Sequence, residues 1–218
     1  TRAYNIIVQN PNILLLYVPN STHLILHHIF QTRYSDSLLA RLINLENNER
    51  ILTQDYIAAT DAVGNNSWHY ALSYASLDII NQLIEVHTAS PQNRFAELIN
   101  SRNDYGHTPL EQAFEINDDL ASDIDFLSAM TSFIERYSGV LNLNEETVLG
   151  IIDQVQDSQP NEDEISEDGQ YTYGQLIQAL NQWIFDMDNL TSGEDQHPLE
   201  DFFGPNSNNE EDQPMEDG

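Results

Sequence analysis

Apolar side chains recur at helical spacing throughout the first 140 residues of this chain. Leucine, isoleucine and phenylalanine follow one another three and four positions apart, which is the spacing that lines one face of a helix. The clearest stretches are Leu24–Ile29, Leu38–Ile43, Leu77–Ile84 and Phe126–Ile134. The connections carry Asn, Asp, Gly and Pro, which suit tight turns. The pattern predicts a mostly helical domain over residues 1–140.

Two further helices are predicted after this domain. The first covers 141–158, and its expected cap and apolar face are Asn144, Val148, Ile151, Ile152 and Val155. The polar, acidic stretch 156–170 is interpreted as a loop. A second helix is expected from about Thr172, which has capping-box spacing with Gln175.

Two segments of the helical domain repeat each other. Residues 61–71 read Asp-Ala-Val-Gly-Asn-Asn-Ser-Trp-His-Tyr-Ala, and residues 103–113 read Asn-Asp-Tyr-Gly-His-Thr-Pro-Leu-Glu-Gln-Ala. Glycine, a large apolar residue and alanine fall at matching offsets, and Gly64 and Gly106 stand 42 residues apart. A period of about 20–50 residues is typical of solenoid proteins.

The second segment resembles an ankyrin repeat. Gly106-x-Thr108-Pro109-Leu110-x-x-Ala113 is similar to the ankyrin motif Gly-x-Thr-Pro-Leu-His-x-Ala, which opens the first helix of a repeat. The segment 61–84 has the same spacing of motif residues and continues it through a second helix. A third, weaker unit starts at Asn20. The resemblance implies stacked helix pairs over about 20–136.

Three residues depart from the ankyrin consensus, since Trp68 replaces Leu, Ser67 replaces Pro and Glu111 replaces His. His69 stands at the family's His position, where the resemblance implies a structural role between turn and helix. Longer spacers indicate irregular repeats. The expected fold is all-α: a degenerate ankyrin-like solenoid over 1–140, a C-terminal helical cap over 141–190 and a disordered acidic tail over 191–218.

Acidic residues outnumber basic ones by 36 to 7, and the formal net charge is −29. Residues 141–218 hold 20 acids and no base, a net charge of −20, against −9 for residues 1–140. Such a charge attracts basic partners and repels nucleic acid and anionic membranes, and it also keeps a protein soluble. We expect a basic protein partner, no nucleic acid and no membrane.

All seven basic residues are arginine, so the chain contains no lysine. Arginine keeps the charge but offers no ε-amine to ubiquitin or acetyl groups. Two explanations stay open. Selection against ubiquitination would fit an adaptor of a ubiquitin ligase or a bacterial effector acting in the cytoplasm of a host cell, whereas compositional drift needs no function.

Several other functional classes lack a sequence signature. The chain has no cysteine, which excludes disulfides and thiolate metal sites, and the apolar run 13–18 is too short to span a bilayer. We expect a cytoplasmic protein without a cofactor. The sequence has no nucleophile elbow, phosphate loop or zinc-protease helix, so an enzyme with a site of scattered acids and histidines is only an alternative hypothesis.

A second alternative is a calcium-regulated switch. Residues 164–175 resemble a degenerate EF-hand loop, with oxygen side chains at positions 1, 3 and 5 and Gly169 at position 6. Gln175 at position 12 cannot supply a bidentate carboxylate. His23 and His27 have metal-ligand spacing on a helix, but without a third ligand nearby they are expected to be partly buried histidines.

We therefore expect a non-catalytic module that binds a protein. By resemblance, ankyrin repeats use their hairpin tips and concave helix face. The candidate contact residues are Ala62, Val63, Asn65, Ser73 and Tyr74 in one unit and Asp104, Tyr105, His107, Glu115 and Ile116 in the next. Phe202 and Phe203, flanked by acids in the tail, are expected either to fold onto a partner or to pack on the chain itself.

Overall fold

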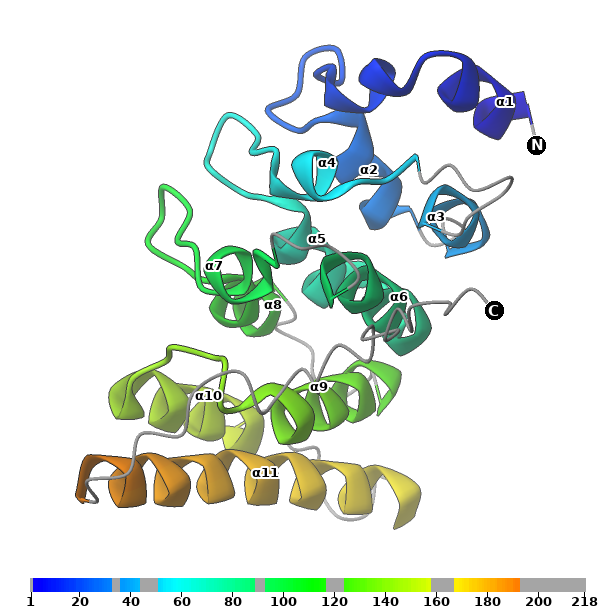
Figure 1. Ribbon diagram of the computed structural model, residues 1–218. Coiled ribbons are helices and arrows are strands. Elements are labelled where there is room, and N and C mark those ends of the chain that lie inside the picture. The colour runs from blue at the N-terminus through cyan, green and yellow to red at the C-terminus, as the bar shows by residue number, and fades with distance from the viewer. Residues whose placement is uncertain are drawn as a thin grey trace, which may run out of the picture.

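The protein is helical throughout the part of the chain that its computed structural model describes (Figure 1). The described residues are 2–32, 36–43, 51–88, 93–116, 124–157 and 167–192. Within these ranges the chain forms eleven α-helices, one short 3₁₀ helix and no strand beyond an isolated bridge between Tyr17 and Leu24. The predicted all-α class is confirmed.

Eight of the helices form four consecutive pairs. The pairs are α2 (Ile25–Gln31) with α3 (Asp36–Ile43), α5 (Ser67–Tyr74) with α6 (Leu77–Thr88), α8 (Pro109–Ile116) with α9 (Ile124–Tyr137), and α10 (Glu145–Asp157) with α11 (Glu167–Ser192). Helix α1 (Arg2–Gln9) comes first, and the short helices η1 (Pro11–Leu15), α4 (Gln54–Ala58) and α7 (Phe95–Ile99) precede the first three pairs.

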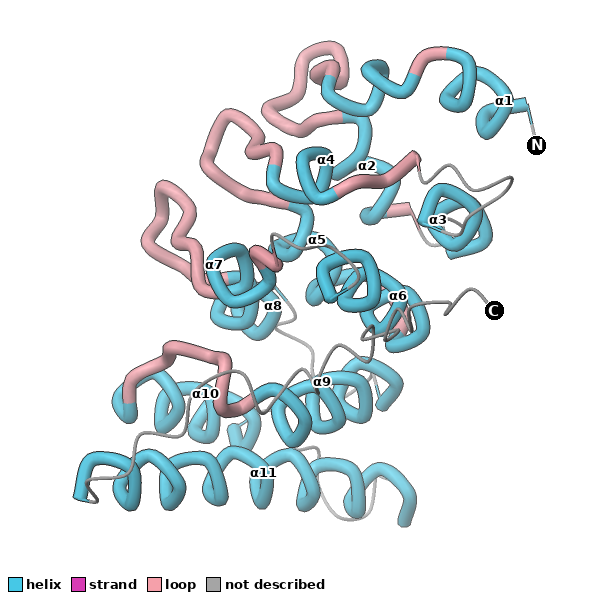
Figure 2. The backbone as a smooth tube through the Cα atoms, in the orientation of Figure 1, coloured by secondary structure: helices cyan, strands magenta, loops and turns pink. Residues whose placement is uncertain are grey.

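The pairs lie beside one another in chain order, from α1 at the top of Figure 1 to α11 at the bottom. Helix α5 packs between α2 and α8, and α3 packs on α6. Helices α10 and α11 pack on α8 and α9, as expected for the C-terminal helices. The loops before α2, α5 and α8 all project to one side of the molecule (Figure 2).

The loops before α5 and α8 have the same backbone structure at a 42-residue interval. In the first, Asp61 Oδ1 accepts the backbone N–H groups of Val63 and Asn65 at 3.0 and 2.9 Å. In the second, Asn103 Oδ1 accepts those of Tyr105 and His107, both at 3.0 Å.

Gly64 and Gly106 occupy equivalent places in these two loops. Their φ angles are 80° and 87°, in the left-handed region that favours glycine. The predicted turns at these glycines are confirmed. The loop before α2 turns differently: Asn20 has φ 60°, and the Ser21 N–H bonds the Val18 carbonyl at 3.0 Å.

Reciprocal caps begin α5 and α8, again 42 residues apart. Asn66 Oδ1 accepts from the Trp68 N–H at 2.8 Å, and the Asn66 N–H donates to His69 Nδ1 at 3.2 Å. At α8 the Thr108 N–H donates to Glu111 Oε2 at 2.6 Å, and Thr108 Oγ1 accepts from the Glu111 N–H at 3.3 Å. The expected structural role of His69 is confirmed, and Glu111 fills the same role at α8.

Adjacent helix pairs share one core. Trp68 is fully buried, meets the Phe95 ring edge-on at 5.2 Å and donates its indole N–H to His87 Nε2 at 3.2 Å. Ala71 and Ala113 are also fully buried where α5 and α8 pack together. Their small side chains let the two helices approach closely.

The C-terminal helices follow the sequence pattern except at the start of α11. Asn144 Oδ1 caps α10 by accepting from the Thr147 N–H at 2.7 Å, and all four predicted face residues of α10 are buried. Helix α11, however, begins at Glu167, so both the expected loop up to 170 and the capping box at Thr172 are wrong.

Tertiary packing accounts for this early start. Farther along, Leu176, Leu180 and Trp183 are buried, and α11 packs along α9, which stabilises a long helix despite Gly169. Residues 167–175 are therefore helical, and the calcium alternative lacks the loop on which it depended.

The remaining regional predictions concern the tail and the membrane. The expected disordered stretch beyond Ser192, with Phe202 and Phe203, lies outside the described residues. Across the described ranges, every helix is too short or too polar to cross a lipid bilayer.

The two loop glycines provide a matched test of the turn geometry. Gly106→Ala is expected to lower the free energy of unfolding by about 1–2 kcal/mol, because alanine disfavours positive φ. Gly64→Ala adds crowding, since a Cβ there would lie 3.2 Å from Asp104 Oδ1 and 3.3 Å from the Asn103 Cα. A Cβ at Gly106 would meet no described atom within 4 Å apart from its chain neighbours. Denaturant unfolding of both variants should show the larger loss at Gly64, and equal losses would contradict this packing.

Candidate functional site

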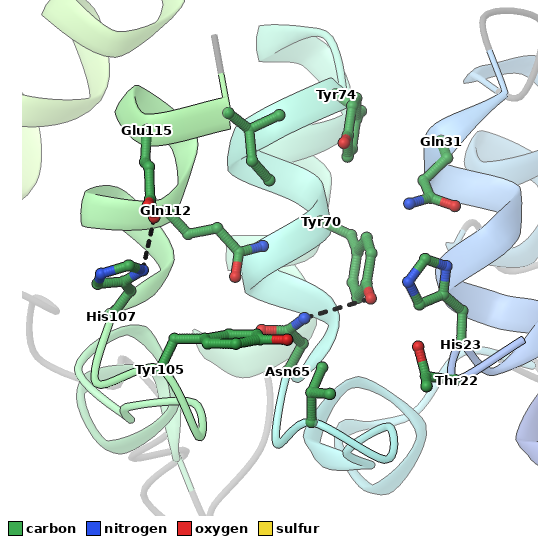
Figure 3. Close-up of a pocket in the computed structure, with 12 residues that line it drawn as sticks. Thr22, His23, Gln31, Asn65, Tyr70, Tyr74, Tyr105, His107, Gln112 and Glu115 are labelled. Atoms are coloured by element: carbon green, nitrogen blue, oxygen red, sulfur yellow. Dashed lines mark hydrogen bonds and ion pairs between the residues drawn. The ribbon is translucent and has the colours of Figure 1, made fainter. Parts of the chain in front are cut away.

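A pocket of about 590 Å³ opens between the loops and first helices of three successive units (Figure 3). We call it the inner pocket. Its lining residues are Thr22, His23 and Gln31 from the first unit, Val63, Asn65, Tyr70 and Tyr74 from the second, and Tyr105, His107, Gln112, Glu115 and Ile116 from the third. Its volume lies within the range of ordinary ligand-binding sites.

The repeat geometry explains why these residues meet. Asn65 and His107 immediately precede the capping residues of α5 and α8, so they stand at the same point of their units. Tyr70 and Tyr74 are one helical turn apart on α5 and therefore share a face. Gln112 and Ile116 hold the same two positions on α8.

A buried polar network forms the floor of the pocket around Asp61. The Tyr70 hydroxyl donates to Asp61 Oδ2 at 2.6 Å and accepts from Asn65 Nδ2 at 3.3 Å. Asp61 also accepts two backbone N–H groups of its loop. One carboxylate therefore fixes both the loop and the Tyr70 ring in the floor of the pocket.

Asn103 extends this network between units. Its Nδ2 donates to Asn65 Oδ1 at 2.8 Å and to Gln112 Oε1 at 2.7 Å. Asn103 is buried, and its amide thus joins the second loop, the third loop and α8. Satisfied buried networks of this kind fix one arrangement of their members.

One wall of the pocket carries an ion pair. His107 Nδ1 lies 2.6 Å from Glu115 Oε2, and the Glu115 side chain is 60% exposed. The rim is aromatic and apolar, because Tyr105 is 70% exposed and Tyr74 43%. The carboxylate of Glu115 and the rings of Tyr74 and Tyr105 are therefore all exposed to solvent at this pocket.

A smaller cavity of about 320 Å³ adjoins the inner pocket and shares Tyr74 with it. Its lining includes Asp36 and Asp125 from α3 and α9. Among the described residues that line the two cavities, none is an arginine, and Arg33, which stands between Thr32 and Asp36 in the sequence, lies outside the described residues. The described walls of both cavities therefore offer carboxylates to a ligand.

Buried neutral histidines lie behind the pocket and in the neighbouring core. His27 stacks on Tyr70 at 4.6 Å between ring centroids, and neither of its ring nitrogens makes a hydrogen bond to the described residues. Burial lowers the pKa of His27 to about 4, against the opposing charge of Asp61, whose Oδ2 is 4.0 Å away. Burial likewise lowers the pKa values of His69 and His87 to about 4.

The structure brings together seven of the twelve residues that the sequence suggested as contacts. They are Val63, Asn65, Tyr74, Tyr105, His107, Glu115 and Ile116. Asn65 is nevertheless buried and acts in the floor. Ala62 and Asp104 lie exposed at loop tips outside the pocket. Phe202 and Phe203 lie outside the described residues.

Ser73 is buried and does not present its hydroxyl to a partner. That hydroxyl donates to the His69 carbonyl one helical turn earlier, at 2.7 Å, so its hydrogen-bonding capacity is used inside α5. Five lining residues were not predicted from the sequence: Thr22, His23, Gln31, Tyr70 and Gln112. Equivalence at 42 residues signals two of them, because Gln31 aligns with Ser73 and Glu115, and His23 aligns with Asn65 and His107.

His23 and His27 lie against one aromatic ring. His27 is enclosed against Tyr70, and His23 meets the same ring edge-on at 5.5 Å. Across the described part of the chain, no three His, Asp or Glu side chains gather as metal ligands would. Both histidines were expected to be partly buried, which is confirmed for His23, whereas His27 is fully buried.

Comparison with known proteins returns no relative: no family model matches the chain, and no curated protein or solved structure does either.

The three buried histidines predict a specific loss of stability in acid. Their pKa values are about 4 when folded and about 6.5 when unfolded, so below pH 6.5 only the unfolded chain takes up these protons. Stability should fall as the pH drops from about 6.5 toward 4, by at most about 1.4 kcal/mol per pH unit for each histidine.

Urea unfolding across this range measures the effect. His27→Leu should reduce the slope of stability against pH by the contribution of one histidine. An identical pH dependence in wild type and His27→Leu would show that His27 is not held neutral in the folded chain.

Proposed function

We propose that this chain is a non-catalytic protein-binding module that holds a segment of a partner in the inner pocket. The observation that carries the proposal is the pocket itself, which three successive loop–helix units build and whose rim exposes Tyr74 and Tyr105. Tyrosine supplies a large, rigid contact area at low entropic cost and is enriched at binding surfaces.

We further propose that the units are degenerate ankyrin repeats stacked as a solenoid. The 42-residue spacing, the positive φ at Gly64 and Gly106 and the reciprocal caps of α5 and α8 support this interpretation. So do the backbone bonds that join consecutive loops, from the Ala62 N–H to the Thr22 carbonyl at 3.2 Å and from the Asp104 N–H to the Val63 carbonyl at 2.9 Å. Each unit would then bury its apolar face against its neighbours.

The proposed partner is a basic protein. The chain has a net charge of −29, and the groove adds the local carboxylates of Glu115, Asp36 and Asp125. An acidic surface steers a basic partner and raises its association rate at low salt.

Affinity capture from a eukaryotic lysate, quantified by mass spectrometry, tests the pocket. The double variant Tyr105→Ala/Ile116→Ala removes two exposed side chains of the rim and should lose the captured partner while keeping its melting temperature. The control Leu149→Ala removes an exposed apolar side chain that does not line the pocket, and it should retain the partner. Equal capture by all three proteins would contradict the proposed site.

We also propose that the protein acts in the cytoplasm beside ubiquitin machinery, as an adaptor or an effector. The complete absence of lysine supports this context, because no ε-amine can then accept ubiquitin. A lysine-free binding module could work next to a ubiquitin ligase without becoming its substrate.

Restoring lysines tests this part of the proposal. The Arg94 side chain is 38% exposed and makes a two-point pair with Glu97, of which lysine would keep one contact. A pair of this kind at the surface, within one helical turn, contributes little to stability. Arg94→Lys, combined with Arg33→Lys and Arg50→Lys outside the described residues, should therefore leave the melting temperature unchanged. The half-life in eukaryotic cells should shorten, and proteasome inhibition should restore it. Equal half-lives would favour compositional drift.

A further inference from the structure

We propose that the inner pocket is an arginine site, which takes the guanidinium of one arginine from an extended basic segment of the partner. The inference rests on the proposed binding function and deepens it by naming the side chain that is recognised. Three features of the pocket carry it: a partly engaged carboxylate, two exposed aromatic side chains and a described lining without arginine.

The carboxylate is that of Glu115. His107 Nδ1 approaches Oε2 at 2.6 Å, while Oε1 has no ion-pair partner among the described residues. His107 therefore holds one carboxylate oxygen, and the side chain remains 60% exposed to solvent, where a ligand can reach it. Charge-assisted hydrogen bonds from a guanidinium to such an oxygen are among the stronger polar contacts in proteins.

The aromatic side chains are Tyr74 and Tyr105, which lie at opposite ends of the pocket in Figure 3, with Gln112 between them. They come from different units, and both are substantially exposed. A guanidinium is planar and weakly hydrated, so it stacks on tyrosine rings more favourably than the compact, strongly hydrated ammonium of lysine. The Tyr70 hydroxyl is already used by Asp61 and Asn65, so the floor does not compete for the ligand's donors.

Charge argues against an anionic occupant. Among the described residues that line the pocket there is no arginine, and His107 Nδ1 already faces Glu115 Oε2 at 2.6 Å. A phosphate or carboxylate ligand would meet the like charge of Glu115, whereas an arginine carries the opposite charge.

Titration with short peptides tests the proposal. The probes are acetyl-Gly-Gly-Arg-Gly-Gly-amide and the same peptide with lysine or citrulline, added to the ¹⁵N-labelled full chain at neutral pH and low salt, up to about 10 mM. We expect the arginine peptide to shift the amide signals of Tyr105, His107 and Ile116. Citrulline has a similar shape without the charge, and it should bind at least about tenfold more weakly, with lysine intermediate.

Matched charge variants separate a local site from general attraction. Glu115→Gln should weaken arginine binding about tenfold, which corresponds to about 1.4 kcal/mol. Glu146→Gln removes the same charge from an exposed position outside the pocket and should have no effect. Tyr105→Ala, at a residue that is 70% exposed, should weaken binding without unfolding the chain.

Three results would overturn the arginine site. They are equal binding of the citrulline peptide, equal effects of Glu115→Gln and Glu146→Gln, and signal shifts confined to residues outside the pocket. If partner capture still depends on Tyr105 and Ile116 in any of these cases, the pocket binds a protein by other chemistry. If capture is also independent of both side chains, the proposed function fails as well.

Discussion

One polar side chain at the start of each loop determines the geometry on which the rest of the structure depends. Asp61 and Asn103 each accept two backbone N–H groups that would otherwise be unpaired close to the core. The other carboxylate oxygen of Asp61 accepts from the Tyr70 hydroxyl on α5. The side-chain nitrogen of Asn103 donates to Gln112 on α8. The same two residues thus shape the turns, orient the helices and form the floor of the inner pocket.

This arrangement couples the units through polar contacts as well as apolar packing. Asn103 bonds Asn65 of the preceding unit, so neither loop can change shape without breaking a buried hydrogen bond. Buried polar groups are costly when unpaired, which favours one register between units. Among the described residues, three buried side chains depart from this rule: both ring nitrogens of His27, Ser67 Oγ and His87 Nδ1 make no hydrogen bond. Burial lowers the pKa of His27, which keeps its ring neutral beside Tyr70. The pocket is therefore preorganised on its second and third units.

Most helices could be predicted because the apolar residues of each helix recur at regular spacing within one short stretch of sequence. The site was predicted in part, since the ankyrin resemblance indicates which residues lie at loop tips and on helix faces but not which of them are buried. The burial of Ser73 could not be predicted because its hydroxyl bonds within α5, and Tyr70 was not predicted because its role depends on Asp61, nine residues away. The start of α11 was misplaced because packing on α9, a tertiary effect, extends the helix beyond its local signals.

Two of the arginines make contacts that a lysine could not reproduce. Arg102 donates Nη1 to both the Gly106 carbonyl and Glu111 Oε2, and Nη2 to Glu111 Oε1, so its fork ties the third loop to the cap of α8. A single lysine ammonium cannot reproduce this planar geometry, which gives arginine a structural reason at this position. Arg94 makes a similar two-point pair, with Nε donating to Glu97 Oε2 at 2.9 Å and Nη2 to Oε1 at 2.6 Å, but this pair stays within one helical turn and joins no separate elements. Planar pairing therefore gives arginine a structural reason at both positions, and at Arg102 this reason includes the connection between a loop and a helix cap.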